Sequence, residues 1–254
     1  MKLNFLGTGT STGVPQIMCD CGVCRSENEH DKRLRASAMV TVGDTNLLID
    51  CGPDFRVQML RAGSPKIEAL LVTHIHYDHV GGVDDLRPYC AAGDGFPVYC
   101  RPDVAKGLID RVPYCFAEHP YPGVPAFNLF EINSKPFKVG DIEVRPLPVK
   151  HYMLEIVGFK IGNLAYITDA KTIPDSTIEM IRGIDTLVIN ALRIKEHISH
   201  MTLSQALDVI QQVKPRVAYL THVSHDMGLH DEVSARLPEN VKLAYDGLSI
   251  YIPD

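Results

Sequence analysis

The 254-residue sequence contains no run of about eighteen apolar residues, the length that a membrane-spanning helix requires. Its first residues, Met1 to Leu6, form a predicted short strand that runs into a Gly-rich turn, without the pattern of a signal peptide. These two absences argue against both a membrane span and secretion. We therefore expect a cytoplasmic protein that does not bind a membrane.

Positive charge is not in excess either. The sequence has 25 Lys and Arg residues against 31 Asp and Glu residues, which gives a net charge of −6. Proteins that bind nucleic acid depend on Lys and Arg to neutralise phosphates, so a large polyanionic partner is disfavoured. A small anionic substrate held by metal ions remains compatible with this charge.

No internal repeat or low-complexity tract divides the chain, and its 45% hydrophobic content is enough for a core. We predict one α/β domain over residues 1–254, a length that single large domains reach. Its middle segment, 84–136, is rich in Pro, Gly, Tyr and Phe and is predicted to contain a lid or rim. Residue patterns predict strands over 2–6, 37–43, 46–50, 98–100, 144–149, 164–168, 186–190, 216–221 and 241–252, and helices over 53–61, 103–111, 174–182 and 203–213.

Three imidazoles and a carboxylate lie within six residues of one another in the run from His74 to His79. This run follows the apolar segment 69–72, so it begins where a buried strand ends. Imidazole and carboxylate together suit divalent ions of the first transition row. His74 and His76 form one pair, and Asp78 and His79 form a second pair. A short loop that turns into a helix would let the two pairs face two different ions.

Three further predicted strands each end at a potential ligand. They run into His151, Asp169 and His222. A single His or Asp after a strand is more often a cap or turn residue. Together with the 74–79 cluster, however, these residues indicate that four strand ends meet at one metal site.

The cluster matches the His-x-His-x-Asp-His loop of the metallo-β-lactamase superfamily, which the chain resembles over nearly its whole length. The resemblance implies a four-layer αββα sandwich of the α/β (α+β) class and a binuclear site. Asp169 would bridge the two ions, and Asp50 would brace the metal loop, although the residues alone favour a plain turn at Asp50 equally. The ligands implied for the first ion are His74, His76 and His151, and those for the second are Asp78, His79 and His222.

Seven cysteines without a secretory signal indicate a reducing compartment, where disulfides are not the default. Cys19, Cys21 and Cys24 put three thiols in six residues, a spacing that favours Zn²⁺, although a redox-active or merely exposed trio stays open. Within the superfamily, this cluster resembles the phosphodiesterase family of the carbon–phosphorus lyase pathway for phosphonate breakdown. That resemblance implies one structural zinc ion, with His225 as its fourth ligand.

The same resemblance implies the activity. It indicates a metal-dependent phosphodiesterase that hydrolyses a small diester, such as a cyclic or ribose-linked phosphate, to a phosphomonoester. Two divalent ions, Mn²⁺ or Zn²⁺, would serve as cofactors and are fixed in part by Asp78 and Asp169. His200 would act as general acid, whereas the residues alone favour a capping or surface role for it. His197 is predicted to lie on the surface, and a homodimer is compatible with the family.

Two other functions stay open. The tRNA 3′-processing endoribonucleases share these ligands, but they grip tRNA with a basic arm, and no Lys- and Arg-rich insertion separates the ligand motifs here. A non-catalytic metal-binding protein of a cofactor pathway would resemble superfamily members with an altered metal loop. The full set of seven ligands argues against that function.

Overall fold

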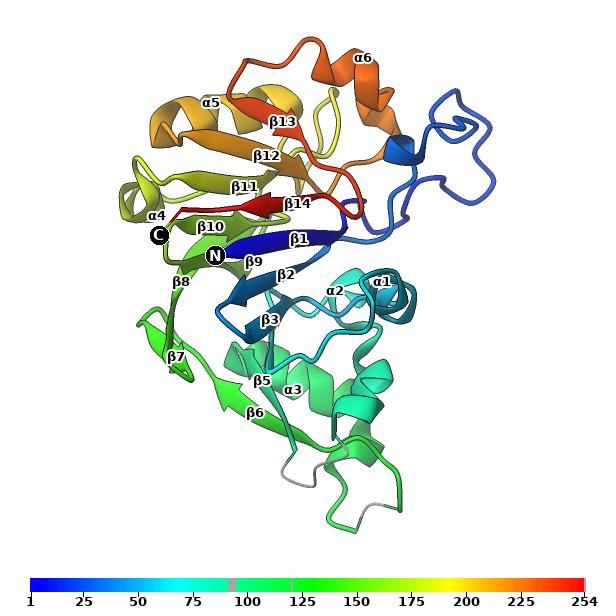
Figure 1. The fold of residues 1–254 in the computed structure, drawn as a ribbon, viewed down its shortest axis with the longest axis vertical. Coiled ribbons are helices and arrows are strands. Elements are labelled where there is room, and N and C mark those ends of the chain that lie inside the picture. Colours follow the sequence, from blue (N-terminus) through cyan, green and yellow to red (C-terminus); the bar gives the residue numbers. More distant parts are fainter. Residues whose placement is uncertain (91–94, 120, 254) are drawn as a thin grey trace.

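The computed structural model describes residues 1–90, 95–119 and 121–253. In this part of the chain, fourteen strands form two seven-stranded sheets (Figure 1). The first sheet has the order β14-β1-β2-β3-β4-β5-β6. Its strands are β1 (Lys2–Gly7), β2 (Ser37–Val42), β3 (Thr45–Ile49), β4 (Ala69–Leu71), β5 (Phe96–Cys100), β6 (Phe127–Glu131) and β14 (Ser249–Tyr251).

The second sheet has the order β13-β12-β11-β10-β9-β8-β7. Parallel pairing joins β10, β11, β12 and β13, and antiparallel pairing joins β7, β8, β9 and β10. Its strands are β7 (Phe137–Val139), β8 (Ile142–His151), β9 (Leu154–Ile161), β10 (Leu164–Ile167), β11 (Thr186–Asn190), β12 (Val217–Thr221) and β13 (Val241–Leu243).

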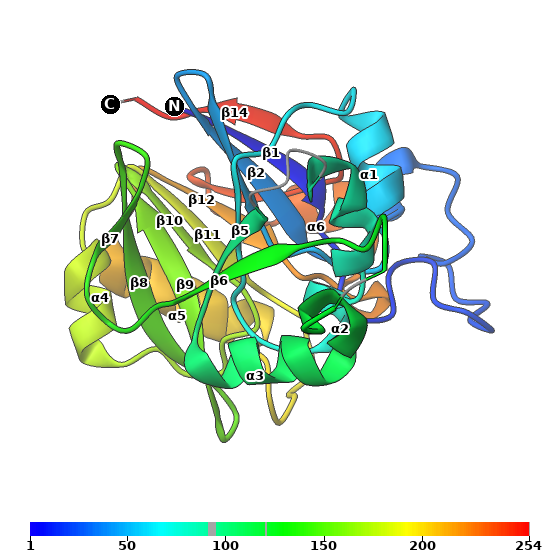
Figure 2. The ribbon, with the colours of Figure 1, turned by 90° about the horizontal axis from the view of Figure 1, so that it is seen from below.

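Helices cover the outer faces of both sheets. The α-helices are α1 (Phe55–Arg61), α2 (Tyr77–Val80), α3 (Pro102–Arg111), α4 (Asp175–Ile181), α5 (Leu203–Val213) and α6 (His230–Ser234). Short 3₁₀ helices are η1 (Glu29–Asp31), η2 (Val83–Cys90), η3 (Pro113–Phe116) and η4 (His225–Met227). Figure 2 shows the view from below, with α3 lying across the near side of the molecule. No helix in the described ranges is long and apolar enough to cross a membrane.

The alternation of side chains along the strands explains the four layers. In β3, Leu47 and Ile49 belong to the core between the sheets, whereas Leu48 packs with α1 to α3 on the outer face. In β10, Tyr166 points into the core between the sheets and Ile167 packs under α4 and α5. Because both faces of these strands are covered, their residues are apolar without interruption. The predicted αββα sandwich is therefore confirmed.

The predicted strand over 241–252 is wrong, because two strands in different sheets share this range. Val241–Leu243 pairs with β12 in the second sheet, and Ser249–Tyr251 pairs with β1 in the first. The chain crosses between the sheets in residues 244–248, where Gly247 has a φ of +87° that favours glycine. Sequence pattern shows two apolar runs but does not show which sheet each one joins.

The segment 84–136, predicted to contain a lid or rim, contributes β5, α3 and β6 to the first sheet and its covering layer. Residues 91–94 and 120 of that segment lie outside the described residues. Pattern alone did not predict β6, since only Phe127 and Leu129 pack against the core, and Phe130 on the other face is exposed. Much of this segment therefore belongs to the sandwich.

Candidate metal centre

The seven predicted active-site ligands lie together at the ends of strands from both sheets. The loop after β4 carries His74 and His76, and the first turn of α2 carries Asp78 and His79. From the second sheet, β8 ends at His151, while Asp169 and His222 follow β10 and β12. The structure forms two groups whose ligand atoms lie within 4.8 Å of one another: His74, His76 and His151, and Asp78, His79, Asp169 and His222.

In the second group, imidazole nitrogens face carboxylate oxygens. His79 Nε2 lies 3.2 Å from oxygens of both Asp78 and Asp169, and His222 Nε2 lies 3.0 Å from Asp169. Neither nitrogen forms a hydrogen bond to any described residue, although both are fully buried. Ligand atoms this close, with no hydrogen bond between them, have the spacing of groups that share one ion. That arrangement fits the ligands of a single divalent ion, which bind it at about 2.0 to 2.2 Å.

Asp169 lies between the two groups. Its Oδ1 is 3.0 Å from His222 Nε2 and 4.0 Å from His74 Nε2, while its Oδ2 faces His79. In the first group, His74 Nε2 lies 3.0 Å from His76 Nδ1. His76 is the exposed member of the seven, so the site opens to solvent there. One carboxylate thus reaches both sets of imidazoles, as a bridging ligand must.

The carboxylates favour positive charge in this buried space. Burial lowers the pKa of His222, but Asp169 and Asp78 outweigh it and raise the pKa to about 9. The same field favours a divalent cation, which competes with that proton for the imidazole. The donor set and its charge therefore fit two divalent ions.

Outer partners fix the tautomers of three imidazoles. His79 Nδ1 donates to Asp50 Oδ2 at 2.7 Å, and His151 Nδ1 donates to the Ser199 carbonyl at 2.8 Å. Thr73 Oγ1 donates to Asp50 and lies 3.0 Å from His74 Nδ1, which must then carry its own proton. In its neutral form each ring therefore presents an unprotonated Nε2 to the site. This is the usual second layer of a metal site, and Asp50 has the bracing position that the resemblance implied.

The backbone has an unusual conformation at three of these strand ends. Asp50, Asp169 and His222 have φ values of +62°, +59° and +56°. Non-glycine residues in this left-handed region cost of order 1 to 3 kcal/mol each and occur often at functional sites. The turn directs each side chain back across the strand ends. Sequence analysis identified these residues but not their conformation.

His200 is buried beside the metal ligands. Its Nδ1 lies 3.7 Å from Asp169 Oδ1 without a hydrogen bond, and its ring is 4.5 Å from that of His151. Burial lowers the pKa of His200 to about 3, with His222 adding to the effect, so the ring is neutral. His197 was expected on the surface, but it is half-buried and its ring lies 5.1 Å from that of His200.

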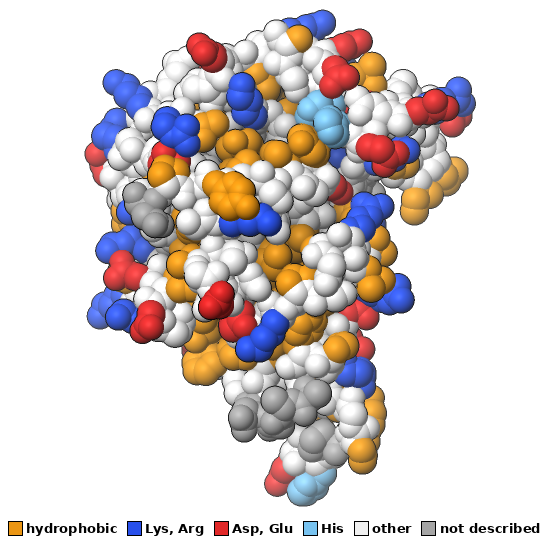
Figure 3. All heavy atoms as spheres, in the orientation of Figure 1, with side chains coloured by type: hydrophobic (Ala, Val, Ile, Leu, Met, Phe, Trp, Pro, Cys, Tyr) orange, Lys and Arg blue, Asp and Glu red, His pale blue; other side chains and the backbone are white. Residues whose placement is uncertain are grey.

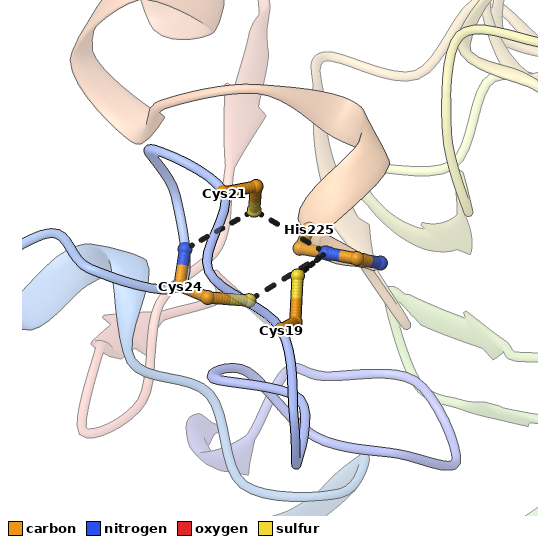
Figure 4. Close-up of side chains that lie close together, drawn as sticks. All are labelled: Cys19, Cys21, Cys24 and His225. Carbon is orange, nitrogen blue, oxygen red and sulfur yellow. Dashed lines mark hydrogen bonds between the residues drawn. The ribbon is translucent and has the colours of Figure 1, made fainter.

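A second cluster lies apart from these residues. Figure 4 shows Cys19, Cys21 and Cys24 pointing toward His225. Their Sγ atoms lie 3.1, 3.4 and 3.5 Å from His225 Nδ1. Tetrahedral zinc with Zn–S of about 2.3 Å and Zn–N of about 2.0 Å separates sulfur and nitrogen by about 3.5 Å. Within the described residues all the cysteines are free thiols, so the trio fits a closed zinc site with His225 as fourth ligand.

The Gly-rich loop that precedes the cysteine cluster is joined to the segment after β12 by backbone hydrogen bonds. Thr10 N donates to the Val223 carbonyl, and Val223 N donates to the Thr8 carbonyl. Val223 follows His222 directly and precedes His225 by two residues. The two candidate metal clusters therefore share one short segment after β12.

Comparison with known proteins agrees with this geometry. A family model described as a beta-lactamase superfamily domain matches residues 45–223. A curated Porphyromonas gingivalis protein called octanoyltransferase is 45% identical over 257 residues, which cover 100% of this chain and 52% of that protein. The chain thus spans about half the length of this relative.

Solved structures agree as well. The crystal structure of a diphosphatase from the PhnP family superposes with a TM-score of 0.93 and 39% identity, covering 99% of this chain and 98% of that chain. Zn²⁺-bound PqqB from Methylobacterium extorquens has a TM-score of 0.80 at 20% identity, covering 99% and 100%, which shows a shared fold.

The chain belongs to the metallo-β-lactamase superfamily. Within it, the chain is close to the PhnP family, as the likeness of its cysteine cluster to the carbon–phosphorus lyase phosphodiesterases had indicated.

Replacing Asp50 tests the outer layer of the site. We expect Asp50→Asn to weaken the binding of one divalent ion about 10- to 100-fold, because the charge that holds His79 and Thr73 is lost. Calorimetric titration of the metal-free protein with Zn²⁺ measures this change. Asp44→Asn, at an exposed carboxylate, is the control. Equal affinities in both variants would contradict the bracing role.

Replacing Cys24 tests the cysteine cluster. We expect Cys24→Ser to lose one zinc equivalent per chain and to retain the ions of the histidine site, since the clusters share no ligand. Elemental analysis of the purified proteins measures the loss. Cys90→Ser, outside the cluster, should keep the full metal content, and an unchanged zinc content in Cys24→Ser would exclude this ligand set.

Proposed function

We propose that the chain is a binuclear metal-dependent phosphodiesterase that hydrolyses a small phosphodiester to a phosphomonoester. The observation that supports it most is the position of Asp169 between two groups of imidazoles, with His200 beside them. His74, His76 and His151 would hold one ion, Asp78, His79 and His222 the second, and Asp169 both. Two divalent ions, Mn²⁺ or Zn²⁺, held by these residues would lower the pKa of a bound water and stabilise the oxygens of an in-line displacement.

The reaction also needs a residue of the protein that protonates the leaving group. In diester hydrolysis, water adds across one P–O bond, and the leaving alkoxide must gain a proton. His200, beside Asp169, would donate that proton. Burial keeps the His200 ring neutral in the free protein. An anionic phosphate bound beside the ring would raise its pKa and so favour the protonated form that donates.

The side chains beside the opening of the site support a small substrate. Figure 3 shows Lys and Arg side chains on one face interspersed with Asp and Glu rather than gathered into a basic patch. Near the opening at His76, the Arg111 guanidinium lies 5.7 Å from the centre of the Tyr77 ring. One cation beside an aromatic ring suits a single phosphate ester better than an RNA backbone.

The activity is tested by ³¹P NMR of the Mn²⁺-loaded protein with a ribose cyclic phosphate. A parallel ³¹P sample contains a short RNA. Because of the name of the Porphyromonas gingivalis relative, a further sample contains an octanoyl thioester, and release of its free thiol is measured. Opening of the cyclic diester alone is the expected result. Cleavage of RNA alone would indicate a tRNA-processing type of nuclease, and hydrolysis of the thioester alone would indicate acyl chemistry. No reaction with any of the three substrates would favour a non-catalytic metal-binding protein.

The role of His200 is tested by the leaving group. We expect His200→Ala to slow hydrolysis of alkyl diesters about 10²- to 10⁴-fold, the range for a lost general acid, and to affect nitrophenyl diesters much less. A nitrophenolate leaves without being protonated. His119→Ala, at an exposed histidine, is the control. Equal losses on both substrates would refute the general-acid role.

A further inference from the structure

Lys171 lies two residues after Asp169, and its side chain is directed into the loop that carries His200. Its side chain is only 17% exposed. The ammonium donates to the His197 carbonyl at 2.7 Å and to the His200 carbonyl at 3.4 Å. It also contacts the Glu196 carboxylate and lies 3.1 Å from Gln205 Oε1. One charged group therefore gathers four acceptors from residues 196–205.

Two of these acceptors are the main-chain carbonyls of residues with imidazole side chains. Holding both carbonyls fixes the backbone on either side of residues 198 and 199. The Ser199 carbonyl, within this span, accepts from His151 Nδ1 at 2.8 Å. The ammonium thus fixes a short span that contains His197 and His200 and the outer partner of a predicted metal ligand.

The backbone of Lys171 belongs to the same network. Its N–H donates to the Lys150 carbonyl at 2.7 Å, and Lys150 directly precedes His151. One residue before it, the Ala170 carbonyl accepts from Met201 N at 3.1 Å. The residue therefore connects three segments, which carry His151, Asp169 and His200.

The start of helix α5 has hydrogen bonds of its own, although Gln205 Oε1 accepts from both Thr202 N and the ammonium. Helix α5 begins with a capping box in which Thr202 Oγ1 and Gln205 bond reciprocally, and this box is complete without Lys171. None of the atoms that the ammonium touches is one of the seven predicted ligand atoms of the histidine site. Loss of the ammonium should therefore loosen residues 196–200 while the helix and the metal ligands remain.

We propose that Lys171 is a positioning residue that holds the 196–200 span so that the His200 imidazole faces the leaving-group oxygen. This inference rests on the proposed phosphodiesterase function. The lysine would not touch the substrate itself, since its ammonium is occupied by protein acceptors. Its effect on catalysis would pass through His200, and a small displacement of a catalytic group is enough to lower the rate.

The kinetic test compares Lys171→Met and Lys171→Arg with Lys195→Met. Lys195 is an exposed lysine of the same loop and is the matched control. For an alkyl diester, we expect Lys171→Met to lower kcat about 10- to 100-fold with KM nearly unchanged. The nitrophenyl diester should react at the normal rate, and Lys171→Arg should recover part of the loss. Metal content should be unchanged in all variants.

The double variant Lys171→Met/His200→Ala separates positioning from a general structural role. If Lys171 acts through His200, the double variant should be no slower than His200→Ala alone. Multiplied losses, equal losses on both diesters, or loss of metal would overturn the proposal. Should Lys171→Met fail to fold, Glu196→Gln is the substitute, because it removes the charge that pairs with the ammonium. We expect it to lower kcat for the alkyl diester by a smaller factor and to leave the nitrophenyl diester unaffected.

Hydrogen exchange gives a readout that does not depend on activity. In Lys171→Met, amides of residues 196–201 should exchange faster than in the unmodified protein, with no change in Lys195→Met. If the unmodified protein hydrolyses no diester, the proposed function fails, and this measurement still decides whether Lys171 orders the loop. Unchanged exchange in Lys171→Met would overturn the positioning role.

Discussion

Two buried carboxylates, Asp78 and Asp169, put negative charge where the strand ends of both sheets meet. The imidazoles of the site are arranged around that charge. Imidazole nitrogens face the carboxylate oxygens at 3.0 to 3.5 Å without hydrogen bonds. Charge buried this deeply is tolerated only when it is paired or binds a metal. A divalent ion would satisfy both the charge and the unpaired nitrogens, which accounts for the gathering of so many ligand side chains in a mostly buried space.

Holding these groups at fixed distances requires rigid support, and the sandwich supplies it. Asp50, Asp169 and His222 follow strands buried on both faces, and their left-handed backbones are set by that surrounding structure. A close approach at Gly52 adds to this, since a Cβ there would lie 2.1 Å from the Asp78 carbonyl. The loop and helix α2 that carry the ligands thus pack directly against the turn after β3.

The two candidate metal clusters and the His200 loop form one connected region. His222 and His225 lie on one short segment, which pairs with the Gly-rich loop near Thr8. Ser224, between them, donates to the Leu192 carbonyl at the start of the His200 loop. The cysteine cluster would therefore fix the segment from which an active-site ligand projects, even though its own ligands are separate.

Strand patterns alone indicated only an α/β fold. The sequence nevertheless identified the clustered side chains, because metal ligands require particular residue types at close spacing, and those motifs carried the resemblance to a superfamily with four layers. It did not determine that 241–252 divides between two sheets, that His197 is half-buried, or that Lys171 holds the loop of His200. Those features depend on contacts between residues far apart in the chain or on the path of the backbone. Only the tertiary structure decides which strand ends meet and which carbonyls face a buried ammonium, since local pattern carries no information about distant partners.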